Sequence, residues 1–216
     1  MIVKQGHALL YDYRAYHKGG KAMDAFELMR TRRSTRKYKE EMPDKELINK
    51  IIEVGRYAPS GSNSQTTHFI VFTDKSILIE MAELVKEEFS KMETDQDMYV
   101  SLRNSINAAK TGNYVFHYGA PVFVVVANKK GYGNAMADSA CALENMMIAA
   151  NALDLGSCWI NQLHWLDGNE RVRAFMGSYG LEDDETITGG LIVGCPDAGL
   201  PDRKPLERKG NTVTWV

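Results

Sequence analysis

A run of cationic residues near the start of the chain could bind a phosphate group. Six of the ten residues from Arg30 to Lys39 are Arg or Lys. One guanidinium group can donate two parallel hydrogen bonds to a phosphate group, and a serine hydroxyl adds a neutral donor. A solvated basic stretch, balanced by the glutamates at positions 40 and 41, is the alternative interpretation. The candidate phosphate ligands are Arg32, Arg33, Ser34 and Arg36.

The segment 59–65 consists of small and amide residues that could approach a ligand closely. Small residues let the backbone come near a bound molecule, and amide side chains both donate and accept hydrogen bonds. Such groups suit a heterocycle with alternating carbonyl and N–H groups. An ordinary loop between a helix and a strand has the same composition, and this is the alternative. The candidate ligand contacts are Pro59, Ser60, Asn63 and Gln65.

Two later segments are weaker candidates for a site. Apolar and polar residues alternate from Leu155 to Gln162, directly after a long apolar stretch. We interpret this segment as a loop that could bring backbone N–H groups to a reacting ring atom, although a lone Trp more often packs in a core. The charged segment 201–209 indicates a surface tail when considered alone. The candidates in these two segments are Trp159, Ile160, Asn161, Gln162, Arg203 and Lys204.

Several classes of protein and site lack support in the sequence. The net charge of −2 indicates no general attraction to nucleic acid or to an anionic membrane. The three cysteines are far apart and the histidines have no metal-ligand spacing, so neither a disulfide framework nor a metal site is expected. Gly131-Tyr132-Gly133 lacks the third glycine of a dinucleotide fingerprint. No apolar run approaches the roughly 18 residues of a transmembrane helix and no signal peptide is recognisable, so we expect a cytoplasmic protein.

Hydrophobic spacing predicts an α+β fold with a few-stranded sheet under long helices, because the strands lack regular βαβ spacing. Residues 1–22 are interpreted as an N-terminal extension, and residues 23–216 as a single domain. Helices are expected from about 23, 44, 75, 97, 134 and 167. Strands are expected over 68–73, 121–127, 186–194 and 212–216.

The expected helix over 134–154 is apolar on nearly its whole surface. A helix of that composition belongs in a core or at a subunit interface. Gly156 is expected to end it as the C′ residue, whereas Asp44 is expected to begin an earlier helix as its N-cap.

Four segments, in this order, resemble the FMN-dependent nitroreductase family. Members have an Arg-rich element after the first short helix, here Arg32 to Arg36, and then a loop similar to Ala58–Thr67 before a strand. Their long central helix ends in a Leu-Gly-x-x-Trp-Ile stretch, here Leu155–Ile160. After a later strand they carry Gly-x-Pro, here Gly194-Cys195-Pro196, and then a basic pair, here Arg203-Lys204.

The resemblance implies a nitroreductase-like fold, with a small mixed or antiparallel sheet flanked by helices, in an intertwined homodimer. Each FMN would lie at the subunit interface, where the basic run of one chain and the pair at 203–204 hold its phosphate and one flavin edge. The segment 59–65 would reach the same flavin from the other chain. Residues 159–162 would lie beside the isoalloxazine ring, with a backbone N–H directed at N5. Two departures from the family pattern, Thr66-Thr67 and Asn161-Gln162, bear on acceptor specificity.

The implied activity is that of an NAD(P)H-dependent flavin oxidoreductase. NADH or NADPH would give a hydride to flavin N5, and a small oxidised acceptor such as a nitroaromatic or a quinone would then take two electrons. No catalytic side chain is predicted, although Arg36 is a candidate for stabilising the reduced, anionic flavin. Two alternatives remain. One is a reductive dehalogenase or flavin-fragmenting relative with a lid at 90–118, and the other is a non-catalytic flavin-binding protein.

Overall fold

The sheet at the centre of the molecule has four antiparallel strands. The computed structural model describes residues 24–199 and 204–216, so the expected extension over residues 1–22 lies outside the described residues. The strands are β1 (His68–Phe72), β2 (Val122–Lys129), β3 (Gly156–Ile160) and β4 (Glu185–Gly194), in the order β1-β2-β4-β3. The expected α+β class with a small antiparallel sheet is confirmed.

The alternation of side chains along β2 creates a core on each face of the sheet. Phe123 and Val125 face one hydrophobic cluster, whereas Val124 and Val126 face the other. Successive side chains of a strand point to opposite faces, so a strand covered on both sides needs apolar residues at every position. This is why the continuous apolar run of β2 forms a central strand.

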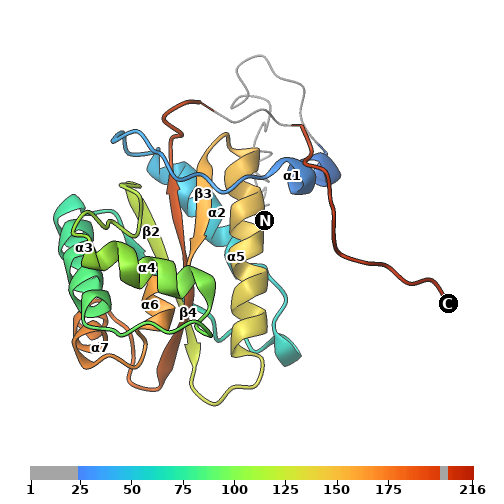
Figure 1. Cartoon of the computed structure of the whole chain (residues 1–216). Helices are drawn as coiled ribbons and strands as arrows, with labels where there is room; N and C mark the ends of the chain where they lie inside the picture. Colours follow the sequence, from blue (N-terminus) through green and yellow to red (C-terminus); the bar gives the residue numbers. More distant parts are fainter. Residues whose placement is uncertain (1–23, 200–203) are drawn as a thin grey trace, which may run out of the picture.

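Helices cover both faces of the sheet. The helices of the described part are α1 (Ala25–Thr31), α2 (Lys45–Arg56), α3 (Lys75–Ser90), α4 (Val100–Lys110), α5 (Ala135–Ala152), α6 (Gln162–Trp165) and α7 (Glu170–Gly177). The helices α2 and α5 pack on one face, and α3, α4, α6 and α7 pack on the other (Figure 1). The expected N-cap at Asp44 is confirmed, because its carboxylate accepts a hydrogen bond from Glu46 N–H at 2.9 Å. Among the described residues, no helix has both the length and the apolar character needed to cross a membrane.

Three local predictions were wrong. Residues 155–162, expected as a loop, form the edge strand β3 and the start of α6. Gly156 opens β3 instead of ending α5, and Asp154 takes the left-handed conformation after the helix, with φ of 59°. Asp tolerates that conformation better than most residues. Residues 212–216, expected as a strand, form none. The tail leaves the body of the molecule, so no strand within residues 24–199 lies beside it (Figure 1).

Candidate functional site

The basic segment after α1 lies along the open edge of β3. Thr35 N–H donates to Ser157 O at 2.9 Å, and Ser34 forms a parallel bridge with Ser157. Further along, Lys39 N–H donates to Cys195 O at 2.9 Å. The segment therefore covers backbone groups of the edge strand that would otherwise be unpaired. These bonds fix the backbone positions from which the arginine side chains extend.

Gly156 permits the close approach of this segment to β3. A Cβ at position 156 would come within 2.8 Å of Thr35 Cβ, which is closer than real side chains pack. Side chains alternate along an extended chain, so when Thr35 faces the strand edge its neighbours face away from it. Ser34 and Arg36 are both exposed in agreement with this arrangement.

A cavity of about 610 Å³ opens at the end of β3. Its wall includes Arg36 and the run 159–162, so the structure brings these predicted site residues together. The volume lies within the range of roughly 300–1,000 Å³ that is typical of small-molecule sites. Aromatic residues that were not predicted as site residues complete the wall. They are Tyr99, Tyr114, Tyr118 and Trp165.

Arg36 is positioned over an aromatic ring of this wall. Its guanidinium carbon lies 5.9 Å from the centre of the Tyr118 ring, a cation–π arrangement. Burial raises the pKa of the neighbouring Cys158 thiol, and the charge of Arg36 offsets only part of that effect. Cys158 is therefore protonated at neutral pH and serves as a packing residue of the wall.

Gln162 connects the end of β3 to the segment 90–118, whereas Asn161 bonds back to β3 itself. Gln162 Nε2 donates to Tyr114 Oη at 2.9 Å and lies 3.4 Å from Ser105 Oγ, while Asn161 Oδ1 accepts from Trp159 Nε1 at 2.6 Å. Asn161 and Gln162, which depart from the family pattern, therefore stabilise the wall of the cavity through these hydrogen bonds. Gln162 also anchors the segment expected as a lid, which contains α4.

Two buried polar atoms of the predicted site segments have no hydrogen-bond partner among the described residues. They are Arg32 Nη1 and Gln162 Oε1. Buried polar atoms are rarely left unpaired, because each one costs desolvation free energy. A cationic donor and an amide acceptor left open in this way fit an anionic heterocycle with ring N–H groups, which is the chemistry of a flavin phosphate.

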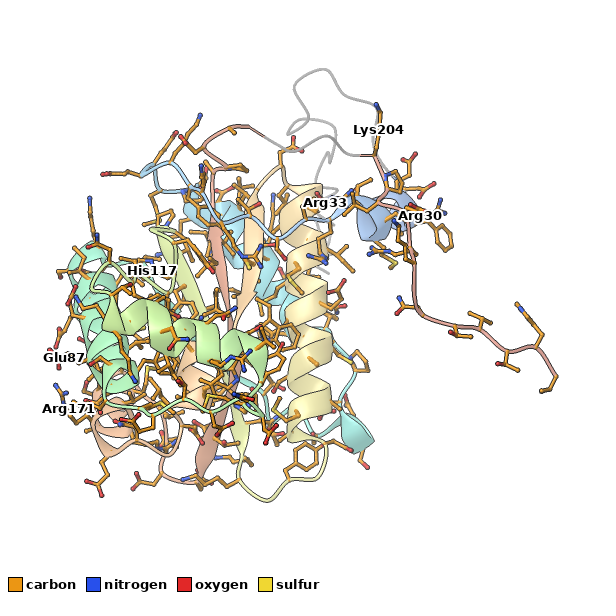
Figure 2. All side chains as sticks on the ribbon, viewed as in Figure 1. Arg30, Arg33, Glu87, His117, Arg171 and Lys204 are labelled. Carbon is orange, nitrogen blue, oxygen red and sulfur yellow. The ribbon has the colours of Figure 1, made fainter. Side chains whose placement is uncertain are left out.

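Arg33 turns toward the end of α1 and the C-terminal segment. Its Nη1 donates to Arg32 O at 2.9 Å and to Arg30 O at 3.2 Å, and its Nη2 donates to the backbone oxygen of Lys204 (Figure 2). Arg33 therefore holds the chain at residue 204 beside α1. The role of Arg33 and Lys204 as phosphate ligands stays a prediction, and Arg203 lies outside the described residues.

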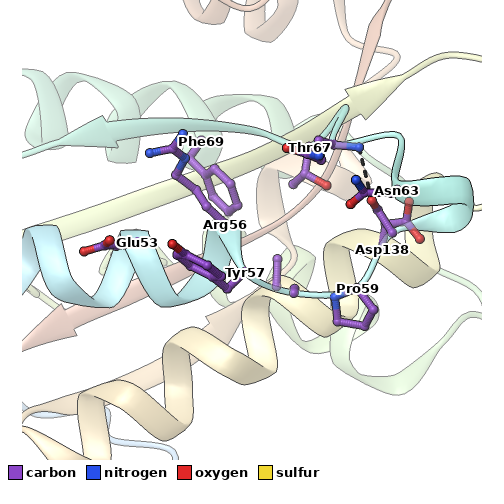
Figure 3. Close-up of a pocket in the computed structure, with 13 residues that line it drawn as sticks. Glu53, Arg56, Tyr57, Pro59, Asn63, Thr67, Phe69 and Asp138 are labelled. Carbon is purple, nitrogen blue, oxygen red and sulfur yellow. Dashed lines mark hydrogen bonds between the residues drawn. The ribbon is translucent and has the colours of Figure 1, made fainter.

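The loop 59–65 has an unusual backbone conformation. Ser62, Asn63 and Gln65 have φ of 54°, 55° and 52°, which non-glycine residues rarely adopt. Such positions cost free energy and gather at functional sites. The loop is held by the carboxylate of Asp138, whose two oxygens each lie 3.2 Å from Gly61 N. Four of its members line a second hollow with the end of α2. They are Pro59, Ser60, Asn63 and Gln65. Asp138 lines the same hollow as Asn63 (Figure 3).

Within one chain, the loop 59–65 and the basic segment lie on different sides of α5. The loop contacts α5 at Asp138, whereas α1 contacts it at Asn151, which donates to Leu28 O at 2.9 Å. The positions 138 and 151 are separated by about 20 Å of helix and face directions about 140° apart. Two sets of predicted site residues therefore line different hollows of the same chain. One set is Arg36 with the run 159–162, and the other is the loop 59–65; we call them the two predicted half-sites. Arg32, Arg33 and Ser34 are not among the residues that line either hollow.

The four-stranded antiparallel sheet lies between helices, and a cationic segment docks on its edge strand beside a cavity. These features define an α+β domain with a cavity of small-molecule size. The model of the nitroreductase family matches residues 29–195, and the chain belongs to this family. It is similar to a nitroreductase from Bacteroides fragilis, solved with bound FMN. The identity is 33%, the TM-score is 0.78, and the match covers 90% of this chain and 99% of that one.

Two further relatives agree with this assignment. A nitroreductase from Desulfitobacterium hafniense, also solved with bound FMN, has 24% identity and a TM-score of 0.75, with 90% of this chain and 99% of that chain covered. A protein of Archaeoglobus fulgidus, named as a candidate NADH dehydrogenase or NAD(P)H nitroreductase, is 26% identical over 177 residues. That match covers 80% of this chain and 86% of the relative. The family resemblance of the sequence segments is confirmed.

Proposed function

We propose that this protein is an FMN-dependent oxidoreductase that passes two electrons from NADH or NADPH to a small oxidised acceptor, such as a nitroaromatic or a quinone. The cavity where Arg36 meets the run 159–162 carries this proposal. The FMN-bound nitroreductase from Bacteroides fragilis, with 33% identity over 90% of this chain, supports it. When bound, FMN supplies the two-electron chemistry, and the protein supplies binding, orientation and electrostatics.

The basic segment holds the anionic part of the cofactor in this proposal. Arg32 offers a buried guanidinium nitrogen without a partner among the described residues, and Ser34 and Arg36 offer exposed donors from the same extended segment. The backbone bonds to β3 place these donors before any ligand arrives. Donors placed in advance stabilise negative charge on a bound ring without a cost of rearrangement.

The proposed active unit is a homodimer in which the loop 59–65 of one chain completes the site of the other. One face of α5 is exposed although its side chains are mostly small or apolar, with Glu144 as its one charged residue. Trp215, in the tail that leaves the body of the molecule, is 92% exposed. A partner chain would bury both surfaces and bring a loop 59–65 to each cavity.

Phosphate binding by the basic segment is tested by titrating the purified protein with FMN and following flavin fluorescence. We expect the double variant Arg32→Ala/Arg36→Ala to bind FMN at least about tenfold more weakly, because each charge-assisted hydrogen bond contributes about 1.5–3 kcal/mol. The double variant Lys37→Ala/Lys39→Ala removes the same two positive charges from exposed positions of the same segment and is the matched control. Unchanged FMN affinity in the variant Arg32→Ala/Arg36→Ala would contradict the proposed role of these arginines in phosphate binding.

The redox function is tested by adding NADH or NADPH to the FMN-loaded protein under argon. The flavin absorbance is expected to bleach, and a nitroaromatic or a quinone is expected to restore it. A protein that binds FMN but does not bleach would indicate a non-catalytic role. If the purified protein does not bind added FMN, the proposal is overturned. Sedimentation of the FMN-loaded protein tests the dimer, and a monomer with FMN bound at micromolar concentration would exclude a shared site.

A further inference from the structure

A third hollow, on the α3 side of the molecule, is separate from the two half-sites. It measures about 390 Å³ and lies between α3, the segment 38–42 and the segment 115–121. Its wall is mainly apolar. Three large apolar side chains around it are exposed, Met42 by 44%, Ile79 by 53% and Val115 by 46%. Apolar side chains gathered around a hollow at the surface indicate a binding site.

His117 is the buried polar residue of this cavity. Its side chain lies beside α3 and is drawn in Figure 2, and the residue is only 6% exposed. Neither ring nitrogen hydrogen-bonds to a described residue. Burial lowers the pKa of His117 and outweighs the opposing effect of the nearby backbone groups of Leu78, His117 and Ala120, none of which reaches hydrogen-bonding geometry with the ring. The ring is therefore neutral at neutral pH and has one donor and one acceptor. A hydroxyl group, which also donates and accepts, would satisfy such a ring.

The charged residues around the cavity favour an uncharged ligand. Lys75 Nζ lies 3.0 Å from a carboxylate oxygen of Glu40, and the carboxylate of Glu83 is paired with Lys86. Each of the three charged residues that line the cavity therefore has an oppositely charged partner, Lys86 being the one partner that lies outside the lining. The mouth therefore offers no excess of either sign that would compensate a charged ligand for its lost hydration.

We propose that this cavity binds a small uncharged phenol, with the hydroxyl group hydrogen-bonded to His117 and the ring packed against Leu78, Ile79 and Val115. The inference does not depend on flavin binding, because the cavity shares no lining residue with either half-site. The two cavities nevertheless meet along one short segment. His117 and Gly119 line this cavity, whereas Tyr118 lines the one beside Arg36.

The test is a titration of the full chain with phenol in the presence of excess FMN, followed by NMR. Saturable shifts are expected at the methyl groups of Ile79 and Val115 and at the His117 ring, and not at Ile160 in the other cavity. Toluene, which has the same ring without the hydroxyl, is the comparison probe. In His117→Leu the ratio of phenol affinity to toluene affinity is expected to fall about two- to tenfold, the value of one neutral hydrogen bond.

A second pair of variants keeps the proposal testable if His117→Leu does not fold. Val115→Trp fills the rim of the cavity and is expected to abolish phenol binding. Val71→Trp makes the same change at an exposed valine of β1 and is expected to leave phenol binding unchanged. Shifts confined to Ile160 and its neighbours, the absence of saturable shifts, or full binding by Val115→Trp would each overturn the proposal.

Discussion

Replacing Gly156 with alanine is expected to loosen the basic segment, the proposed phosphate-binding part of the site, from the strand that supports it. The new Cβ would lie 2.7–2.8 Å from three side-chain atoms of Thr35, including Cβ itself, so a change of rotamer cannot relieve the clash. Non-bonded carbons pack at about 3.5–4.0 Å, so Thr35 would have to move by about 1 Å. That shift would break the hydrogen bond from Thr35 N–H to Ser157 O, now 2.9 Å long.

The expected cost follows from these contacts. Overpacking and the lost hydrogen bond together destabilise the folded protein by about 1–3 kcal/mol. Displacing Ser34 and Arg36 from their ligand by a similar distance removes at least one charge-assisted bond, which lowers FMN affinity about ten- to hundredfold.

Urea unfolding and an FMN titration measure the two effects of Gly156→Ala separately. Gly168→Ala is the matched control, because no atom lies within 4 Å of its added Cβ and its backbone is not left-handed. The control is expected to match the wild type in FMN affinity. A Gly156→Ala protein that binds FMN as tightly as the control would refute the idea that the strand edge positions the basic segment.

Three further substitutions test other parts of the structure. Glu88, whose side chain is 7% exposed, bonds to Lys91, Asn169 and Arg171, and these contacts lower its pKa to about 2. A carboxyl group whose pKa is lowered by folding stabilises the protein at pH values above 4.5, its pKa in the unfolded chain. This stabilisation is lost as the pH falls toward 2. Urea unfolding of Glu88→Gln should therefore show a free energy of unfolding that is lower by about 1–2 kcal/mol at pH 7 and by less near pH 2.5. The value at pH 7 is set below the one that the pKa shift implies, because both cations are half exposed and solvent screens them. Asp138→Asn weakens the acceptor for Gly61 N–H, so FMN affinity is expected to fall several-fold with cooperative unfolding kept, and unchanged affinity would contradict a positioning role. Phe89→Ala empties a fully buried site and is expected to cost about 3–5 kcal/mol in thermal unfolding, whereas a cost below 1 kcal/mol would show that the core collapses around it.

Local signals were sufficient for most elements of the fold. The apolar run of β2 required burial on both faces, and the Asp44 side chain caps α2 as its position suggested. Residues 155–162 were misjudged because a five-residue edge strand is too short to show a period of its own. Their strand character comes from pairing with β4, whose partner residues lie more than 25 positions away.

The α+β class, the family and the cationic residues of the proposed phosphate-binding segment could be predicted from the sequence, since these depend on neighbouring residues and on their order. Which candidates meet could be seen only after the elements were packed together. The tertiary structure placed Arg36 beside the run 159–162, added Tyr114 and Tyr118 from the segment 90–118, and put the loop 59–65 on another side of α5. It also showed Arg33 bonded to backbone oxygens at the end of α1. The physical reason is that contacts between distant segments depend on sheet order and helix packing, which no local pattern records.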